Sequence, residues 1–238
     1  MQDLSFQRDA YFAGIKRVTP LAIPGIPFGF VLGVLITNEG LPAFASWASS
    51  FIIFAGSSQL AALSLLADDA SAFVVIISVF LINSRHAIYS AALRHRFASY
   101  PTRVRALMAY VLIDQQFAVT ETAPELETPT QRYRLWHFLG GGTLLWTNWQ
   151  IAVALGILLG DVVPESWNLG FAVPLLFIGL WVLAVKNSPG VVASVVGGAV
   201  AVLARGLPQG SGLLLAIILG VVAAGIADSR QQVDEAQP

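Results

Sequence analysis

Long apolar runs separated by short polar connections dominate this chain of 238 residues, and they restrict its fold more than any other feature. A helix needs about 20 apolar residues to cross a bilayer core of roughly 30 Å. The runs are apolar on all sides, whereas the strands of a membrane barrel alternate in polarity. We therefore expect an all-α integral membrane protein with seven or eight transmembrane helices. The eight candidate runs are residues 18–37, 43–66, 72–93, 104–120, 135–159, 169–185, 191–204 and 212–227.

The charge content supports the membrane class and argues against several other functions. Only 11% of the residues are charged, compared with about 25% in soluble domains. A net charge of −1 does not indicate a nucleic-acid partner. The chain has no cysteine, and its three histidines lack the spacing of metal ligands, so we expect no metal site and no cofactor. Since it also lacks the common catalytic and phosphate-binding motifs, we expect no enzyme. We interpret residues 1–238 as a single transmembrane domain with polar tails at 1–17 and 228–238.

Four consecutive runs in the N-terminal half contain helix-breaking or polar residues near their centres, so we expect several broken helices. Proline removes a backbone donor and clashes with the preceding turn, while glycine lets another backbone approach closely. Each break has an ordinary interpretation, as a helix start or a tight helix crossing, but interrupted membrane helices are typical of transporter binding sites. The residues that we take as the candidate substrate path are Gly25, Pro27, Gly29, Gly56, Ser57, Ser58, Gln59, Asn83 and Arg85.

Arg85 is the most informative of these residues, because it lies inside an apolar run. A guanidinium at membrane depth costs about 2.5–3.5 kcal/mol on insertion scales. Its planar fork matches a carboxylate, and helices that restart after a break offer free N–H groups to an anion. Asp114 is the only acid deep in a run, which makes it a candidate acceptor for an ammonium group or a proton carrier. His86 is a second candidate for proton coupling, since imidazole titrates near neutral pH. The alternative is that Arg85 and Asp114 form a purely structural ion pair.

The distribution of basic residues bears on topology. Residues 91–105 hold four arginines and no acid, and the N-terminal tail holds three basic and two acidic residues, a net charge of +1. The positive-inside rule favours the cytoplasmic side for both segments, yet three runs lie between them. Either one of those three runs does not cross fully, or the N-terminal tail lies outside.

Three motifs, in this order, resemble those of the AzlC family, the large subunit of bacterial branched-chain amino acid exporters: residues 25–29 (GIPFG), 54–59 (FAGSSQ) and 83–89 (NSRHAIY). The resemblance covers about residues 13–122. It implies a secondary exporter in the bacterial inner membrane that uses the membrane potential or a proton gradient. It also implies a small AzlD-type membrane subunit as partner. Gln115 stands where family members often carry glutamate, which leaves Asp114 as a single carboxylate.

Export of branched-chain amino acids is the leading hypothesis, and two alternatives stay open. The first is a transporter of another small metabolite. The second is a membrane scaffold or assembly subunit without its own translocation path. A scaffold would keep Ser57, Ser58 and Arg85 dry and paired with other groups, whereas a transporter would expose them to water.

Overall fold

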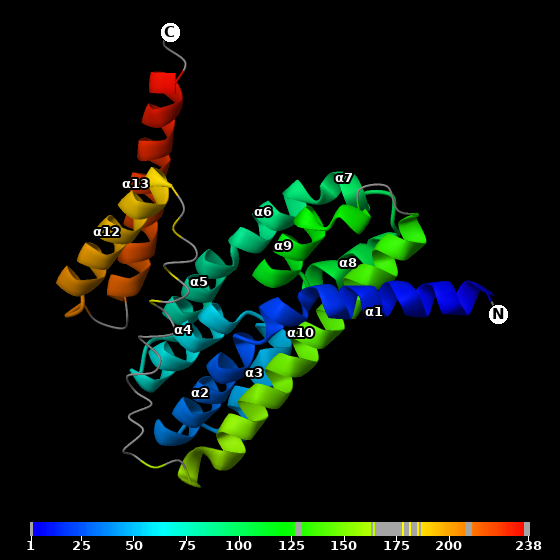
Figure 1. The fold of residues 1–238 in the computed structure, drawn as a ribbon. Helices are drawn as coiled ribbons and strands as arrows, with labels where there is room; N and C mark the ends of the chain where they lie inside the picture. The colour runs from blue at the N-terminus through cyan, green and yellow to red at the C-terminus, as the bar shows by residue number, and fades with distance from the viewer. Residues whose placement is uncertain are drawn as a thin grey trace. The chain divides into compact units, whose positions relative to one another are not determined.

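The computed structural model describes residues 2–126, 130–162, 187–207 and 211–235, together with residues 164, 178, 181 and 185. All regular structure in these residues is helical, which confirms the all-α class (Figure 1). Two short 3₁₀ helices, η1 (Pro124–Leu126) and η2 (Gly160–Val162), accompany the α-helices. The α-helices are α1 (Gln2–Ala22), α2 (Gly25–Asn38), α3 (Ala43–Ile52), α4 (Gly56–Ala67), α5 (Ala72–Asn83), α6 (Arg85–Ala92), α7 (Arg94–Phe97), α8 (Thr102–Tyr110), α9 (Asp114–Thr122), α10 (Gln131–Leu159), α12 (Ser188–Leu203) and α13 (Ser211–Glu235).

Three helices in the described part of the chain are long and apolar enough to cross a membrane: Ala72–Ala92, Gln131–Val162 and Ser211–Gln231. The bent pair Ser5–Ala22 and Gly25–Asn38, with 61° between its halves, makes a fourth if it is counted as one span. The expected seven or eight crossings are therefore not confirmed. The reason is that internal breaks divide two of the runs into helices of 9 to 12 residues, about half of what a bilayer requires. The run at 169–185 lies almost entirely outside the described residues.

Helix breaks occur in all four of the runs where they were expected. Residues 23–24 separate α1 from α2, residues 53–55 separate α3 from α4, and residues 111–113 separate α8 from α9. Ile113 is extended, with φ −115° and ψ 176°. Ser84, between α5 and α6, keeps helical angles of φ −55° and ψ −26°, so the third run is a locally disturbed helix and not an unwound one.

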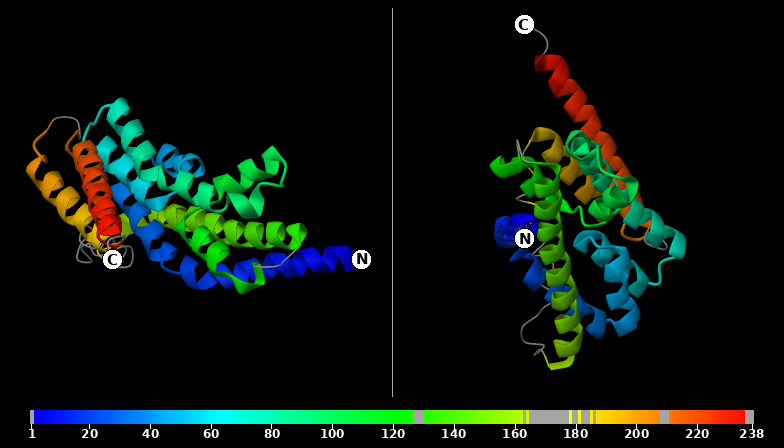
Figure 2. Two further views of the ribbon diagram at one scale, coloured as in Figure 1. Left: turned by 90° about the horizontal axis from the view of Figure 1, so that it is seen from above. Right: turned by 90° about the vertical axis from the view of Figure 1, so that its right-hand side faces the viewer.

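The chain divides into two compact units, the first formed by Met1–Gln59 and Asn83–Pro164, the second by Leu60–Ile82 and Glu165–Pro238. The long helix α10 is the centre of the first unit, with α1 and α2 packed along it (Figure 2). Thr130 caps α10, because its hydroxyl accepts a 3.2 Å hydrogen bond from the backbone N–H of Tyr133.

Three consecutive buried glycines at 140–142 allow neighbours to approach α10 closely from different sides. A Cβ at the first would meet the backbone carbonyl of Tyr11 in α1. A Cβ at the second would lie 2.6 Å from Oε1 of Gln116 in α9, and one at the third 2.7 Å from Val111. The side chain of Gln116 also donates a 2.9 Å hydrogen bond to the carbonyl of Phe138. These contacts hold α9 and the break before it against α10.

Both polar ends of the sequence are largely helical. Residues 2–17 belong to α1, and Ala10 and Val18 on that helix are fully buried at 0% exposure. The polar N-terminal segment therefore packs into the first unit through one apolar face. At the other end, α13 continues to Glu235.

The second unit is built around the pair α12 and α13. Its buried cluster consists of Leu65, Ala70 and Val74, with Leu213 and Leu214 of α13 packed against it. Many of its apolar side chains face outward, as expected for helices in lipid.

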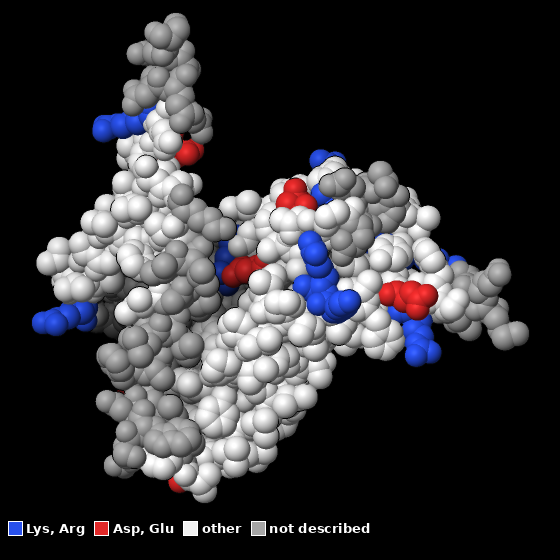
Figure 3. Space-filling model, viewed as in Figure 1, with Lys and Arg blue, Asp and Glu red and all other residues white. Residues whose placement is uncertain are grey.

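On the face of the protein shown in Figure 3, charged side chains are few and scattered over an otherwise uncharged surface.

Candidate functional site

Three helices of the first unit begin at one place, and Arg85 connects them. Arg85 is the first residue of α6, and Asp114 is the first residue of α9. The Nη1 of Arg85 donates a 2.7 Å hydrogen bond to Oδ2 of Asp114, and its Nη2 donates one of 2.9 Å to Oγ of Ser57, the second residue of α4. The structure thus brings together three residues that the sequence singled out in three different runs. Their role in transport stays a prediction.

The helix ends give this site an uneven electrostatic character. The N-terminus of a helix carries a partial positive charge, which favours Asp114 at the start of α9 and disfavours Arg85 at the start of α6. The ion pair between them offsets the second effect.

The Arg85 and Asp114 side chains are 32% and 46% exposed. Within the described residues, Nε of Arg85 and Oδ1 of Asp114 are buried atoms without a hydrogen-bond partner. The ion pair therefore keeps one unused donor, on Arg85, and one unused acceptor, on Asp114.

Ser58 and Asn83 tie the start of α4 to the end of α5 next to this ion pair. The Ser58 hydroxyl lies 2.9 Å from Oδ1 of Asn83 and 3.0 Å from the carbonyl oxygen of Ala55, and it can donate to either. Ser58 is fully buried, at 0% exposure. The two residues therefore set the position of the neighbouring Ser57.

Tyr89 belongs to the site and was not among the predicted residues. Its ring stacks on Phe117 of α9 with centroids 4.5 Å apart and 13° between the planes, and its phenol interacts with the Asp114 carboxylate. The signal for it was its spacing, because residues i and i+4 of a helix lie on one face and Tyr89 is four residues after Arg85. The His86 ring lies 6.0 Å from the Tyr89 ring. In the described chain its Nε2 is buried without a hydrogen-bond partner.

Gln59 does not line the site, although it was predicted there. It is fully buried in a polar cluster between α3, α4 and α10. Its Nε2 donates a 2.6 Å hydrogen bond to Oγ of Ser50 and lies 3.1 Å from Oγ of Ser49, while its Oε1 accepts a 2.9 Å hydrogen bond from Nε1 of Trp149. Gln59 therefore fixes the first turn of α4, from which Ser57 reaches Arg85. Serines at 46, 49 and 50 share one face of α3, which was the available sequence signal for this cluster.

Replacing Gln59 by leucine should destabilise the protein by about 2–4 kcal/mol, because Ser50 and Trp149 each lose a buried partner. The measurement is the fraction of monodisperse protein left after heating in detergent. Gln131→Leu is the matched control, since Gln131 is exposed and its side chain bonds, among the described residues, to the hydroxyl of exposed Ser99 at 2.8 Å. Equal thermal stability of the two variants would contradict this assignment.

The predicted glycines shape helix packing and do not contact the ion pair. A Cβ at Gly56 would lie 2.7 Å from the Trp149 ring, and one at Gly29 would lie 2.8 Å from the Cβ of Ala152. Gly25 faces Asn148, whose Nδ2 donates a 3.0 Å hydrogen bond to the carbonyl of Ala22.

At the α1–α2 bend, the backbone N–H of Ile26 bonds to the carbonyl of Ile23, so the carbonyl of Ala22 loses its usual helical donor. The hydrogen bond from Asn148 replaces that donor. Pro27 is exposed on α2. Among the described residues, no group of three or more histidine, aspartate or glutamate side chains could hold a metal ion.

The family model described as AzlC protein matches residues 20–163, a range that includes Ser57, Arg85 and Asp114. The chain is 27% identical to the inner membrane protein YgaZ of Escherichia coli over 89% of this chain and 86% of that protein. It is 31% identical to an uncharacterized membrane protein of Archaeoglobus fulgidus over 94% of both chains.

A third relative is the branched-chain amino acid transport protein AzlC of Bacillus subtilis, 23% identical over 74% of this chain and 70% of that protein. No solved structure matches the chain. The similarity therefore extends well beyond residues 13–122, where the motifs alone indicated it. Relatives that align over most of their length are membrane proteins by name, and the family model covers more than half of the sequence. On this evidence, the protein belongs to the AzlC family.

Proposed function

We propose that this protein is the large subunit of a secondary active exporter of branched-chain amino acids in the bacterial inner membrane. The observation that carries the proposal is the junction of three helix N-termini at Arg85, which bonds to Ser57 and Asp114 and retains one buried, unused donor. The name of the Bacillus subtilis relative supports the substrate class. A small AzlD-type membrane subunit completes the transporter.

The junction has the groups that a zwitterionic amino acid needs. Its carboxylate binds the guanidinium of Arg85 and the N–H groups at the start of α4 and α6. Its ammonium group binds Oδ1 of Asp114 and the amide oxygen of Asn83. The Tyr89 and Phe117 rings beside the site offer an apolar surface to the side chain.

The substrate competes with Asp114 for Arg85. Without substrate, Asp114 holds Arg85. When a substrate carboxylate takes over the guanidinium, the ammonium group of the substrate replaces Arg85 as the positive partner of Asp114. His86, whose ring lies 6.0 Å from the Tyr89 ring, is our candidate for carrying a coupled proton. Release of substrate restores the ion pair.

The function is tested by efflux of labelled valine from cells loaded with valine-containing dipeptide, with the chain and its small partner expressed together. We expect faster efflux than in cells that lack the chain, and slower efflux when the proton gradient is collapsed. A panel of charged and small polar amino acids in the same cells tests substrate class. Efflux equal to that of the empty cells, for valine, leucine and isoleucine alike, would refute the proposal.

Water access separates a transporter from a scaffold, and the absence of cysteine makes the assay clean. We expect Ser57→Cys to react with a water-soluble thiol reagent, because Ser57 lies at the partly exposed ion pair. Ser50→Cys should not react, since Ser50 is at 0% exposure. Labelling is read as a mass increase of the intact protein. If both variants resist the reagent, the site is dry and the scaffold interpretation is favoured.

A further inference from the structure

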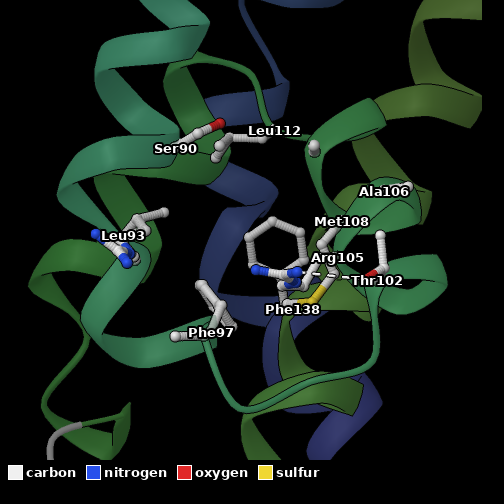
Figure 4. Close-up of a pocket in the computed structure, with 12 residues that line it drawn as sticks. Ser90, Leu93, Phe97, Thr102, Arg105, Ala106, Met108, Leu112 and Phe138 are labelled. Carbon is white, nitrogen blue, oxygen red and sulfur yellow. Dashed lines mark hydrogen bonds between the residues drawn. The ribbon is translucent and has the colours of Figure 1, made fainter.

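A pocket of about 340 Å³ lies in the first unit between α6, α7, α8 and α10. It is separate from the substrate site, because neither Arg85 nor Asp114 lines it. Its walls are mainly apolar, with Leu93 and Phe97 on one side and Thr102, Arg105 and Ala106 on the opposite side (Figure 4). The volume falls within the usual range for small-molecule sites.

Two guanidinium groups give this apolar pocket a positive charge. Arg94 begins α7 and Arg105 lies in α8, and both line the pocket. Arg105 makes one long hydrogen bond, of 3.3 Å, to the hydroxyl of Thr102. Among the described residues, no aspartate or glutamate lines the pocket. Its ligand therefore needs a negative head and an apolar body.

The missing acidic group argues against the amino acid substrate as occupant. An amino acid carries an ammonium group that needs an acceptor. In the described part of the lining, the polar, uncharged side chains are the hydroxyls of Ser90 and Thr102. The arginines also belong to segment 91–105, the most basic part of the chain, which the positive-inside rule places at the cytoplasmic surface. Anionic phospholipids are abundant in the cytoplasmic leaflet, and basic pockets between membrane helices bind their headgroups.

We propose that this pocket binds an anionic phospholipid, with the phosphate at Arg94 and Arg105 and the first part of an acyl chain along Leu93, Phe97 and Phe138. The lipid would contact α6, which carries Arg85, and the break that precedes Asp114. Ser90 of the pocket is on α6, as is Arg85, and Leu112 of the pocket lies in the break just before Asp114. Lipid binding therefore stabilises the spacing of α6 and α9.

Native mass spectrometry of the full-length protein in mild detergent tests the proposal without any measurement of transport. We expect phosphatidylglycerol to be retained in preference to zwitterionic phosphatidylcholine. Arg94→Gln and Arg105→Gln should each weaken retention about fivefold, since one basic residue near an anionic membrane surface contributes roughly 1 kcal/mol. Ala109→Trp, which fills the pocket, should weaken it as well.

Matched variants on the same helix serve as controls. Arg103→Gln removes the same charge from an exposed position outside the pocket lining, and Leu107→Trp adds the same ring at another such position. Both should retain phosphatidylglycerol like the unchanged protein. Equal loss in Arg103→Gln and Arg105→Gln would overturn the proposal, as would equal retention of the two lipids. Displacement by glycerol 3-phosphate at the same concentration would show an anion site without a lipid component and would overturn it too.

Discussion

Arg85→Gln is expected to lower valine efflux by on the order of 100-fold, while the protein still inserts in the membrane. The substitution removes the guanidinium that we propose binds the substrate carboxylate through two charge-assisted hydrogen bonds, in place of its present bonds to Asp114 and Ser57. Each such bond contributes about 1.5–3 kcal/mol, and a loss of about 3 kcal/mol corresponds to roughly 100-fold. Asp114→Asn should have a similar effect. Efflux is normalised to the amount of protein in the membrane, and Arg103→Gln serves as the control with the same loss of charge.

Double variants separate a transport role from a structural ion pair. Arg85→Gln with Asp114→Asn removes both charges, so no unpaired ion remains, and the exchanged pair Arg85→Asp with Asp114→Arg keeps an ion pair. If the pair were structural, either double variant would recover efflux. We expect both to recover protein level and thermal stability but not transport. Wild-type efflux in either double variant would remove the substrate site that we propose.

Gly156→Ala is expected to destabilise the first unit strongly, because the added methyl group would meet backbone atoms of α2. Its Cβ would collide with the backbone carbonyl of Phe30 and lie 2.8 Å from the Cα of Gly33. Backbone atoms on both sides leave no flexible side chain to move, so α2 would have to separate from α10. Overpacking of this kind costs about 1–3 kcal/mol or more. The measurement is the temperature at which helical circular dichroism is lost in detergent.

Gly198→Ala on α12 is the control for that variant, because nothing lies within 4 Å of its added Cβ. Alanine is the better helix former, by about 0.5–1 kcal/mol in a helix interior, so this change should leave the transition unchanged or raise it. A lower transition in Gly198→Ala than in Gly156→Ala would contradict the close crossing of α2 and α10.

Part of the site could be predicted from the sequence because its residues are unusual for a membrane helix. A charged guanidinium in an apolar run needs a partner, which singled out Arg85 and Asp114. Proline and glycine interrupt helices, so the breaks at residues 23–24 and 53–55, next to Gly25 and Gly56, could be expected. The break at 111–113 has neither residue, and only the polar residues that follow it from Asp114 indicated it. The basic segment 91–105 stood out as a topology signal, but the pocket that Arg94 and Arg105 line could not be predicted, because its walls form only when α6, α7, α8 and α10 pack together.

The sequence by itself determined that this is an all-helical membrane protein with an interrupted N-terminal half, since hydrophobicity and backbone chemistry act along the chain. The tertiary structure decided which polar groups meet. Gln59 lies two residues from Ser57 in the chain, yet its side chain does not reach Arg85. It bonds instead to Trp149, 90 positions away. It also decided how many runs are long enough to cross a bilayer. Such choices depend on the direction of side chains and the approach of distant helices, which local sequence rules do not specify.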